Sequence, residues 1–72
     1  MFNDTILNNL KLANMQATED QIIEACKIAN VYEAIMKFPK GMQTVVGNNG
    51  MRLSGGEKQR IAIARAVLTD PK

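Results

Sequence analysis

The sequence contains no histidine and no tryptophan, and Cys26 is its single cysteine. A disulfide needs two cysteines and structural zinc sites need several cysteines or histidines, so the composition excludes an internal disulfide and a Cys/His zinc site. No stretch approaches the ~18 consecutive apolar residues of a membrane-spanning helix, and nothing resembles a signal peptide. These absences favour a reducing compartment, with any membrane contact provided by another polypeptide segment.

Charge of neither sign dominates the chain. Nine lysines and arginines against seven acidic residues give a formal net charge of +2, and the charges are spread along the 72 residues. Such a balance does not by itself predict nucleic-acid binding. The hydrophobic content of 46% suffices for one small domain, but a chain this short buries only about 60% of the surface it exposes when unfolded. We therefore expect marginal stability.

Two helices are predicted in the first 30 residues. The first spans 3–10, begins at an Asn or Asp cap, and places apolar residues four apart on one face. Thr18 and Gln21 have the spacing of a capping box, in which two backbone N–H groups are satisfied reciprocally. A second helix is therefore expected from about Glu19 to Ala29.

A third short helix, 31–37, is predicted because Asn30 and Glu33 repeat the capping-box spacing. The turn residues 39–41 should end it, and 44–46 are too few for more than a brief extended strand. The apolar residues expected inside are Ile22, Cys26, Ala29, Val31, Ala34, Ile35 and Phe38, with Ile23 and Ala25 at the edge.

The last segment predicts a helix from Gly55 to about Leu68, ended by Asp70-Pro71. Between Ile61 and Leu68 only Arg65 is not apolar. A helix that is apolar nearly all round has to be enclosed on more than one side. Three short helices would leave one flank of it wet, so we expect a larger body to pack there and the chain to be part of a longer protein.

The start of this helix is the best candidate site. Ser54 and Glu57 form another capping-box pattern, with Gly55 and Gly56 inside the first turn. A helix N-terminus presents unpaired N–H groups and about half a positive elementary charge, which suits phosphate oxygens. The glycines lack the Cβ atoms that would hold a phosphate away, and the serine adds a hydroxyl. The alternative is that the four residues only cap a structural helix.

The longer run decides in favour of the phosphate site. Residues 53–60, Leu-Ser-Gly-Gly-Glu-Lys-Gln-Arg, followed by the apolar helix 61–66 and by 70–72, closely resemble the signature motif and following helix of ABC-type ATPases. A chance match across the whole run is improbable, because its length far exceeds that of a short motif.

Two further segments extend the resemblance over essentially the whole chain. Residues 2–6 with Asn9 resemble the start of the family's helical subdomain, just after its Q-loop. Residues 44–47 with Gly50 resemble the X-loop that exporter-type members carry shortly before the signature. The exporter type is therefore favoured, and bacterial lipid A and multidrug half-transporters are the nearest in character.

The resemblance implies a mainly α fold of about four helices, an incomplete piece of a larger α/β P-loop ATPase domain. Residues 1–72 would be a partial nucleotide-binding domain, with the helical subdomain and X-loop in 1–50 and the signature and following helix in 51–72. The parent would use ATP and Mg to export a lipid or drug-like substrate, and this domain would lie at the cytoplasmic face of the membrane. Its partners would be a second nucleotide-binding domain and the coupling helices of a transmembrane domain.

In this family the Walker A loop of one subunit holds ATP, and the signature of the opposite subunit closes over the γ-phosphate. The resemblance implies that Ser54 and Gly56 touch that phosphate, that Gly55 permits close approach, and that Glu57 belongs to the same ATP site. The residues that would report nucleotide state to the coupling helices are Thr44, Val45, Val46, Gly47, Asn48 and Gly50. Glu57 stands where many members have Gln, and Asn48 stands where exporter X-loops usually have Glu.

The elements that hold Mg-ATP and cleave it are missing from these residues. A Walker A loop needs Gly-x-x-x-x-Gly-Lys followed by Ser or Thr. Gly50 and Gly55 have the spacing of the two glycines, but Gly56 stands where the lysine is needed. Neither a Walker B strand nor a histidine is present. We therefore expect the 72 residues alone to be inactive, soluble and monomeric, with no catalytic residue and no metal site. One helix terminus contributes at most ~2 kcal/mol toward an anion, whereas a dissociation constant of about 1 mM needs about 4.1 kcal/mol. The chain alone should bind ATP no tighter than millimolar.

Two alternatives remain at this stage. A small helical nucleic-acid-binding module would lay the last helix, with Lys58, Arg60 and Arg65, on phosphates, but the apolar residues 61–64 argue against a helix in a groove. A soluble DNA-repair or chromosome ATPase of the same superfamily is disfavoured by the X-loop match. We therefore expect no nucleic-acid partner.

Overall fold

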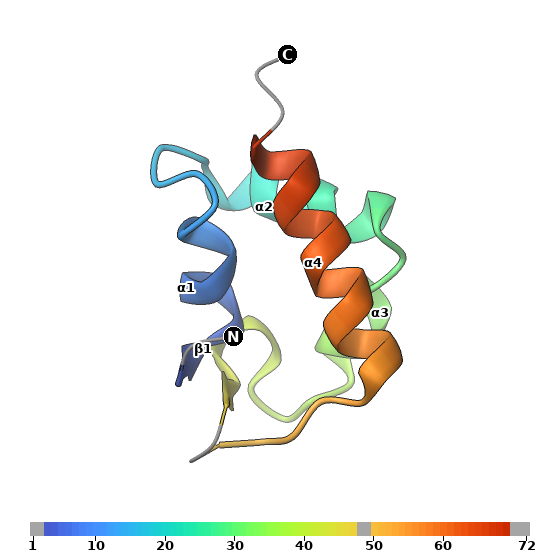
Figure 1. Cartoon of the computed structure of the whole chain (residues 1–72). Helices are drawn as coiled ribbons and strands as arrows, with labels where there is room; N and C mark the ends of the chain where they lie inside the picture. Colours follow the sequence, from blue (N-terminus) through green and yellow to red (C-terminus); the bar gives the residue numbers. More distant parts are fainter. Residues whose placement is uncertain (1–2, 48–49, 70–72) are drawn as a thin grey trace.

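Four α-helices and one short antiparallel strand pair form the part of the chain that the computed structural model describes, residues 3–47 and 50–69 (Figure 1). The expected mainly α fold is confirmed. In chain order the elements are β1 (Asp4–Thr5), α1 (Ile6–Lys11), α2 (Glu19–Ile28), α3 (Tyr32–Met36), the 3₁₀ helix η1 (Gly41–Gln43), β2 (Val45–Val46) and α4 (Gly55–Thr69).

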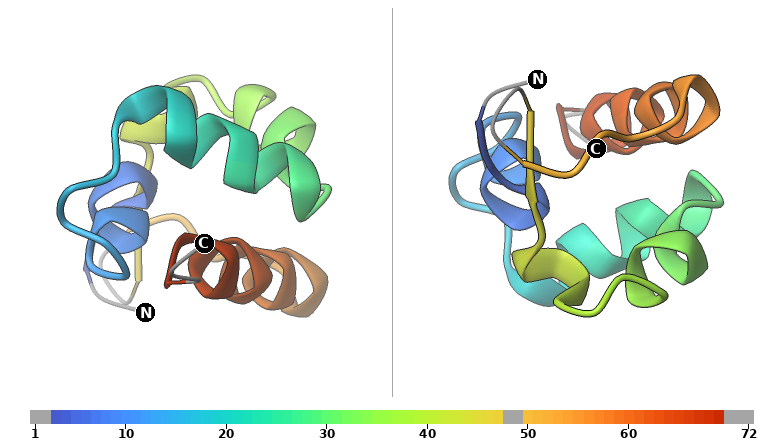
Figure 2. Two further views of the ribbon diagram at one scale, coloured as in Figure 1. Left: turned by 90° about the horizontal axis from the view of Figure 1, so that it is seen from above. Right: turned by 90° about the horizontal axis from the view of Figure 1, so that it is seen from below.

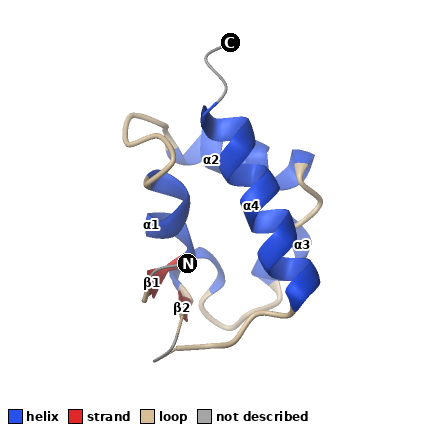
Figure 3. Cartoon of the chain, viewed as in Figure 1, coloured by secondary structure: helices blue, strands red, loops and turns tan. Residues whose placement is uncertain are grey.

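The helices α2 and α4 lie side by side, and α1 packs beside the carboxyl-terminal half of α4 (Figure 2). The amide of Asn14, in the loop after α1, ties this corner together by donating a hydrogen bond of 3.2 Å to the carbonyl of Leu68. The two strands lie at the other end of the molecule, away from the carboxyl end of α4 (Figure 3). The amino end of α4 is thereby left clear of α1.

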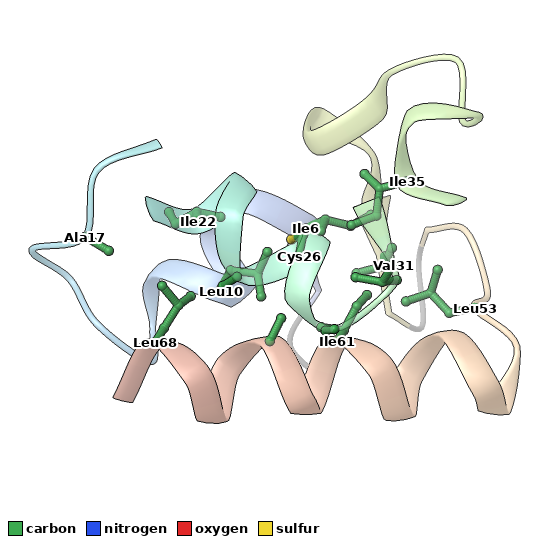
Figure 4. Packing of buried hydrophobic residues seen from close by; sticks show 14 residues of the cluster. Ile6, Leu10, Ala17, Ile22, Cys26, Val31, Ile35, Leu53, Ile61 and Leu68 are labelled. Carbon is green, nitrogen blue, oxygen red and sulfur yellow. The ribbon is translucent and has the colours of Figure 1, made fainter. Parts of the chain in front are cut away.

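The core fills the space between these helices, and its labelled side chains gather on one side of α4 (Figure 4). Ala25 is fully buried rather than at the edge, whereas Ala34 and Phe38 are only partly buried. The buried apolar residues are Ile6, Leu10, Ala17, Ile22, Ala25, Cys26, Ala29, Val31, Ile35, Val46, Leu53, Ile61, Ala64 and Leu68.

The first helix begins later than predicted and has a different cap. Neither Asn3 nor Asp4 caps it, because β1 keeps the backbone extended through Thr5, at φ −65° and ψ 158°. The hydroxyl of Thr5 therefore accepts the hydrogen bond from the N–H of Asn8, at 3.0 Å. The Asp4 carboxylate instead accepts from the side-chain amide of Asn8 and from the Thr5 N–H, and these two hydrogen bonds lower the pKa of Asp4.

The capping box predicted for α2 is confirmed, but the one predicted for α3 is wrong. Thr18 and Gln21 exchange both hydrogen bonds. Asn30 instead has a left-handed backbone, with φ +63°, and Val31 precedes α3 without any side-chain cap.

Asn30 ends α2 rather than starting α3. Its N–H donates to the carbonyl of Lys27 at 3.1 Å, and the N–H of Val31 donates to the carbonyl of Cys26 at 2.9 Å. These two bonds form a Schellman motif, in which a residue with positive φ closes the helix, and Asn tolerates that conformation better than most residues. Asn30 thus belongs to a helix C-terminus, and its spacing to Glu33 forms no cap on α3.

One flank of α4 remains open, as its composition predicted. Ile61, Ala64 and Leu68 are buried against the other helices. On the remaining surface Ala62 and Ala66 are exposed, and 45% of the Ile63 side chain is accessible.

Candidate functional site

A reciprocal capping box opens α4. The N–H of Ser54 donates to the Glu57 carboxylate at 2.9 Å, and the N–H of Glu57 donates to the Ser54 hydroxyl oxygen at 3.1 Å. Lys58 makes the first intrahelical bond, from its N–H to the Ser54 carbonyl at 3.0 Å. The Ser54 hydroxyl accepts in this arrangement, so its own proton is left to donate to an anion.

Two backbone donors of the first turn remain available. The first four N–H groups of a helix have no intrahelical partner; here they belong to residues 54–57, and Ser54 and Glu57 satisfy each other's. Within residues 3–47 and 50–69, no acceptor faces the N–H groups of Gly55 and Gly56. Both available donors therefore belong to the glycines, at the end of the helix where the dipole favours a negative charge.

The fold itself gives no reason for glycine at these two positions. Neither Gly55 nor Gly56 has a positive φ. A Cβ added at Gly55 would meet nothing within 4 Å, and one at Gly56 would meet only the Ser54 hydroxyl, at 4.0 Å. Alanine would make a better helix by up to ~1 kcal/mol per position, so the empty space suits a group from outside the described chain.

This turn is exposed but firmly anchored. Ser54, Gly55 and Gly56 are exposed and Glu57 is half-buried. Directly before them, Leu53 is only 7% exposed and points into the core near Val31 (Figure 4). The site is therefore an open helix end that directly follows a buried residue.

The predicted X-loop residues form β2 and its flanks. β2 pairs antiparallel with β1, Asp4 opposite Val46 and Thr5 opposite Val45. Val46 is fully buried, whereas 46% of the Val45 side chain is exposed. The expected brief strand is confirmed.

The residues beside β2 are closely packed. Thr44 is buried, and its hydroxyl has no hydrogen-bond partner in the described part of the chain. Gly47 has φ +108°, and a Cβ there would collide with Asn3. Asn48, one of the predicted X-loop residues, lies outside the described residues.

The structure brings the two predicted segments together, which sequence reasoning missed. The N–H of Met51 donates to the carbonyl of Val45 at 2.9 Å, and Met51 also forms a parallel bridge with Val46. β1 was missed as well, since two residues carry no strand pattern. The buried amide of Asn9 supports this end by donating to the carbonyl of Thr5 at 2.9 Å.

Among residues 3–47 and 50–69, no three side chains of the types that bind metals gather into a possible metal site. None of the helices in residues 3–47 and 50–69 combines the length and apolarity needed to cross a bilayer.

Comparison with known proteins gives one consistent result. The family model described as "ABC transporter" matches residues 2–72. ABC transporter B family member 4 of Dictyostelium discoideum is 58% identical over 72 residues, which is 100% of this chain and 9% of that protein. P-glycoprotein 14 of Caenorhabditis elegans is 53% identical over 72 residues, again 100% of this chain but 5% of that protein.

A solved structure agrees with the sequence matches. A bacterial Atm1-family ABC exporter with ATP bound superposes with a TM-score of 0.88 at 42% identity, covering 99% of this chain and 12% of that one. The chain thus spans about a tenth or less of the two relatives above and 12% of the exporter structure.

Proposed function

Because the chain belongs to the ABC transporter family, as its resemblance to the exporter type predicted, we propose that it is part of an ATP-binding cassette. In the parent protein this cassette couples ATP binding and hydrolysis to the export of a lipid or drug-like substrate across a membrane. The chain contributes the helical subdomain and X-loop in residues 1–50, and the signature and its helix in 51–72.

The observation that carries this proposal is the open glycine turn at the start of α4. It offers two N–H groups, on Gly55 and Gly56, a hydroxyl on Ser54, and space that no side chain of the described chain occupies. Such a set fits the terminal phosphate of a nucleotide, because preorganised N–H donors at a helix N-terminus stabilise negative charge without reorganising. Glu57 holds the turn in shape by bonding to the Ser54 N–H.

The turn covers an anion rather than enclosing a whole nucleotide. The donors of Ser54, Gly55 and Gly56 all belong to one exposed helix end. In this proposal the Walker A loop of the opposite nucleotide-binding domain holds ATP together with Mg. The terminal phosphate of that ATP supplies the charge that the turn recognises. The parent is therefore the ATPase, and the 72 residues alone are inactive.

The remaining parts of the proposal concern the membrane side. The X-loop around β2 contacts the coupling helices of the transmembrane domain, at the cytoplasmic face. The Val45 side chain, 46% exposed, supports this contact, because it gives that end an apolar surface.

Two substitutions in the full-length protein test the phosphate role. Gly56→Asp keeps the backbone N–H but places a carboxylate on the turn, which repels the phosphate, and losing one such preorganised contact costs ~3 kcal/mol of transition-state stabilisation. ATP turnover should fall by at least about 100-fold. Gly56→Ala should leave stability unchanged or raise it by up to ~1 kcal/mol, because the added Cβ meets only the Ser54 hydroxyl within the chain, at 4.0 Å. Turnover should nevertheless fall at least about tenfold, because the Cβ occupies the space proposed for the phosphate.

The matched control is Gln59→Asp, which puts the same charge on an exposed position of α4 beyond the first turn. Its turnover should stay within about threefold of the unmodified protein, since its N–H is already bonded inside the helix. Normal turnover in Gly56→Asp would disprove the assignment of this turn.

A further inference from the structure

β2 is held on both sides by backbone hydrogen bonds. On one side it pairs with β1. On the other, the N–H of Met51 donates to the carbonyl of Val45 at 2.9 Å, and Met51 forms a parallel bridge with Val46. The chain entering α4 is therefore attached to β2 three residues before Ser54.

Gly50 makes this close contact possible. A Cβ at position 50 would overlap the carbonyl oxygen of Val45 and lie 2.7 Å from its carbonyl carbon. These are backbone atoms, which cannot rotate away as a flexible side chain would. Gly50 does not have a positive φ, so glycine is needed here for space rather than for an unusual backbone conformation.

The short link from Met51 to Ser54 has two anchors and little slack. Met51 is fixed by its backbone bond to Val45, and Leu53 is fixed by its side chain, which is only 7% exposed in the core. Only Arg52, which is exposed, lies between them. The position of Ser54 thus depends on the position of β2.

We propose that Gly50 and the N–H of Met51 are positioning residues for the phosphate-binding turn, which they act on through Ser54. This inference rests on the proposed function and adds to it the way the turn is held in place. The tie makes β2 and the start of α4 move together, so a displacement of the X-loop displaces Ser54. Catalytic geometry is sensitive at this scale, since a shift of about 1 Å can cost about 100-fold in rate.

The test uses the full-length protein and compares Met51→Pro with Met51→Ala. Proline removes the N–H that bonds to Val45, whereas alanine keeps it and shortens only a side chain that is 39% exposed. Gly50→Ala disturbs the same contact sterically. Three quantities are measured: ATP turnover, ATP affinity, and hydrogen exchange, without nucleotide, of the 54–58 amides that are hydrogen-bonded, those of Ser54, Glu57 and Lys58.

Met51→Pro and Gly50→Ala should lower kcat by about tenfold or more, speed exchange of the 54–58 amides, and leave ATP affinity within about twofold, since the opposite domain holds the nucleotide. Met51→Ala should match the unmodified protein in all three. If Met51→Pro also loses ATP affinity and its thermal midpoint falls sharply, the proline has disrupted the fold. The comparison of Gly50→Ala with Met51→Ala then decides the question.

Unchanged kcat and unchanged 54–58 exchange in Gly50→Ala overturn the positioning role. The exchange measurement needs no ATP, so it separates this outcome from failure of the proposed function. Faster exchange with normal turnover, together with normal turnover in Gly56→Asp, would mean that the tie exists but that the turn does not bind phosphate. Faster exchange with normal turnover while Gly56→Asp is inactive would also overturn the positioning role.

Discussion

Glycine serves two different purposes in this chain. At Gly47 and Gly50 a Cβ would collide with Asn3 or with the backbone of Val45, so the fold itself demands glycine. At Gly55 and Gly56 the fold leaves room and the backbone is ordinary. A glycine that its own chain does not need, in the first turn of a helix, is best explained by what approaches from outside.

Cys26 illustrates the opposite case, a residue explained wholly by burial. It is fully buried between the helices, and burial raises the pKa of its thiol from 9.0 to about 11. The folded state therefore favours the protonated thiol, and this contribution to stability is present below about pH 9 and lost as the pH rises through about 11.

We expect the Cys26→Ala protein to lose part of this alkaline sensitivity. The difference in thermal midpoint between the original protein and the variant should shrink steadily from about pH 8.5 to about pH 11, because the thiol ionises preferentially in the unfolded state. Other groups titrate in this range, but they are common to both proteins and cancel in the difference. A constant difference over that range would show that the thiol titrates alike in both states.

At the scale of helices and strands, two capping boxes of the same chemistry stand at the starts of α2 and α4. Thr18 with Gln21, and Ser54 with Glu57, each exchange two hydrogen bonds of 2.9 to 3.1 Å. The first box is followed by ordinary helix residues, and the second by two glycines. Geometry alone does not distinguish them, so their difference has to appear in function.

Thr18→Ala and Ser54→Ala in the full-length protein distinguish a residue that only caps a helix from one that also binds phosphate. Each should cost about 1 kcal/mol of stability, because each removes one N-cap acceptor. Only Ser54→Ala should lower ATP turnover, by about tenfold or more, since only that hydroxyl faces the phosphate in the proposed function. Equal turnover in both variants would reduce Ser54 to a helix cap.

The end of α2 allows a separate prediction about Asn30. Asn30→Gly should keep or slightly increase the thermal midpoint, because glycine adopts φ +63° without strain. Asn30→Val should lower stability by about 1–2 kcal/mol, because a β-branched residue resists the left-handed conformation. Denaturant titrations of the two variants measure the difference, and equal midpoints would contradict the role assigned to this residue.

At the scale of the whole molecule, α4 connects two ends with different tasks. Its amino end carries the open glycine turn, and its carboxyl end is held by the amide of Asn14. With 15 residues it spans about 22 Å, much of the 33 Å length of the molecule. One side of this rod is covered by α1 and α2, while Ile63 and its neighbours leave the other side open.

We expect the 72 residues by themselves to bind nucleotide only weakly. Its phosphate donors all belong to one helix end, which contributes at most ~2 kcal/mol, well short of the about 4.1 kcal/mol that millimolar affinity requires. A titration of the 72 residues with ATP, followed by NMR chemical shifts, should show no saturation below about 1 mM. Saturation at micromolar ATP would require a second set of donors and would refute this reading of the site.

Local features of this protein could be predicted from the residues alone. The starts of α2 and α4 could be predicted because each is set by a capping box whose two residues lie within one helical turn. The candidate phosphate site lies inside the second of these turns. Neighbours this close interact in any context that permits a helix. The open flank of α4 also followed from its composition, because apolar residues on all faces exceed what three short helices can cover.

Other features depend on residues brought together from distant parts of the chain. β1 exists because residues about 40 positions away supply its partner strand, and the extended backbone it imposes moves the cap of α1 to Thr5. Asn30 ends α2 rather than starting α3 because its backbone has φ +63° and its N–H bonds back to the carbonyl of Lys27, which the spacing to Glu33 did not indicate. The attachment of Met51 to Val45 has no sequence signal at all, since a backbone hydrogen bond depends on where two segments lie and not on their side chains.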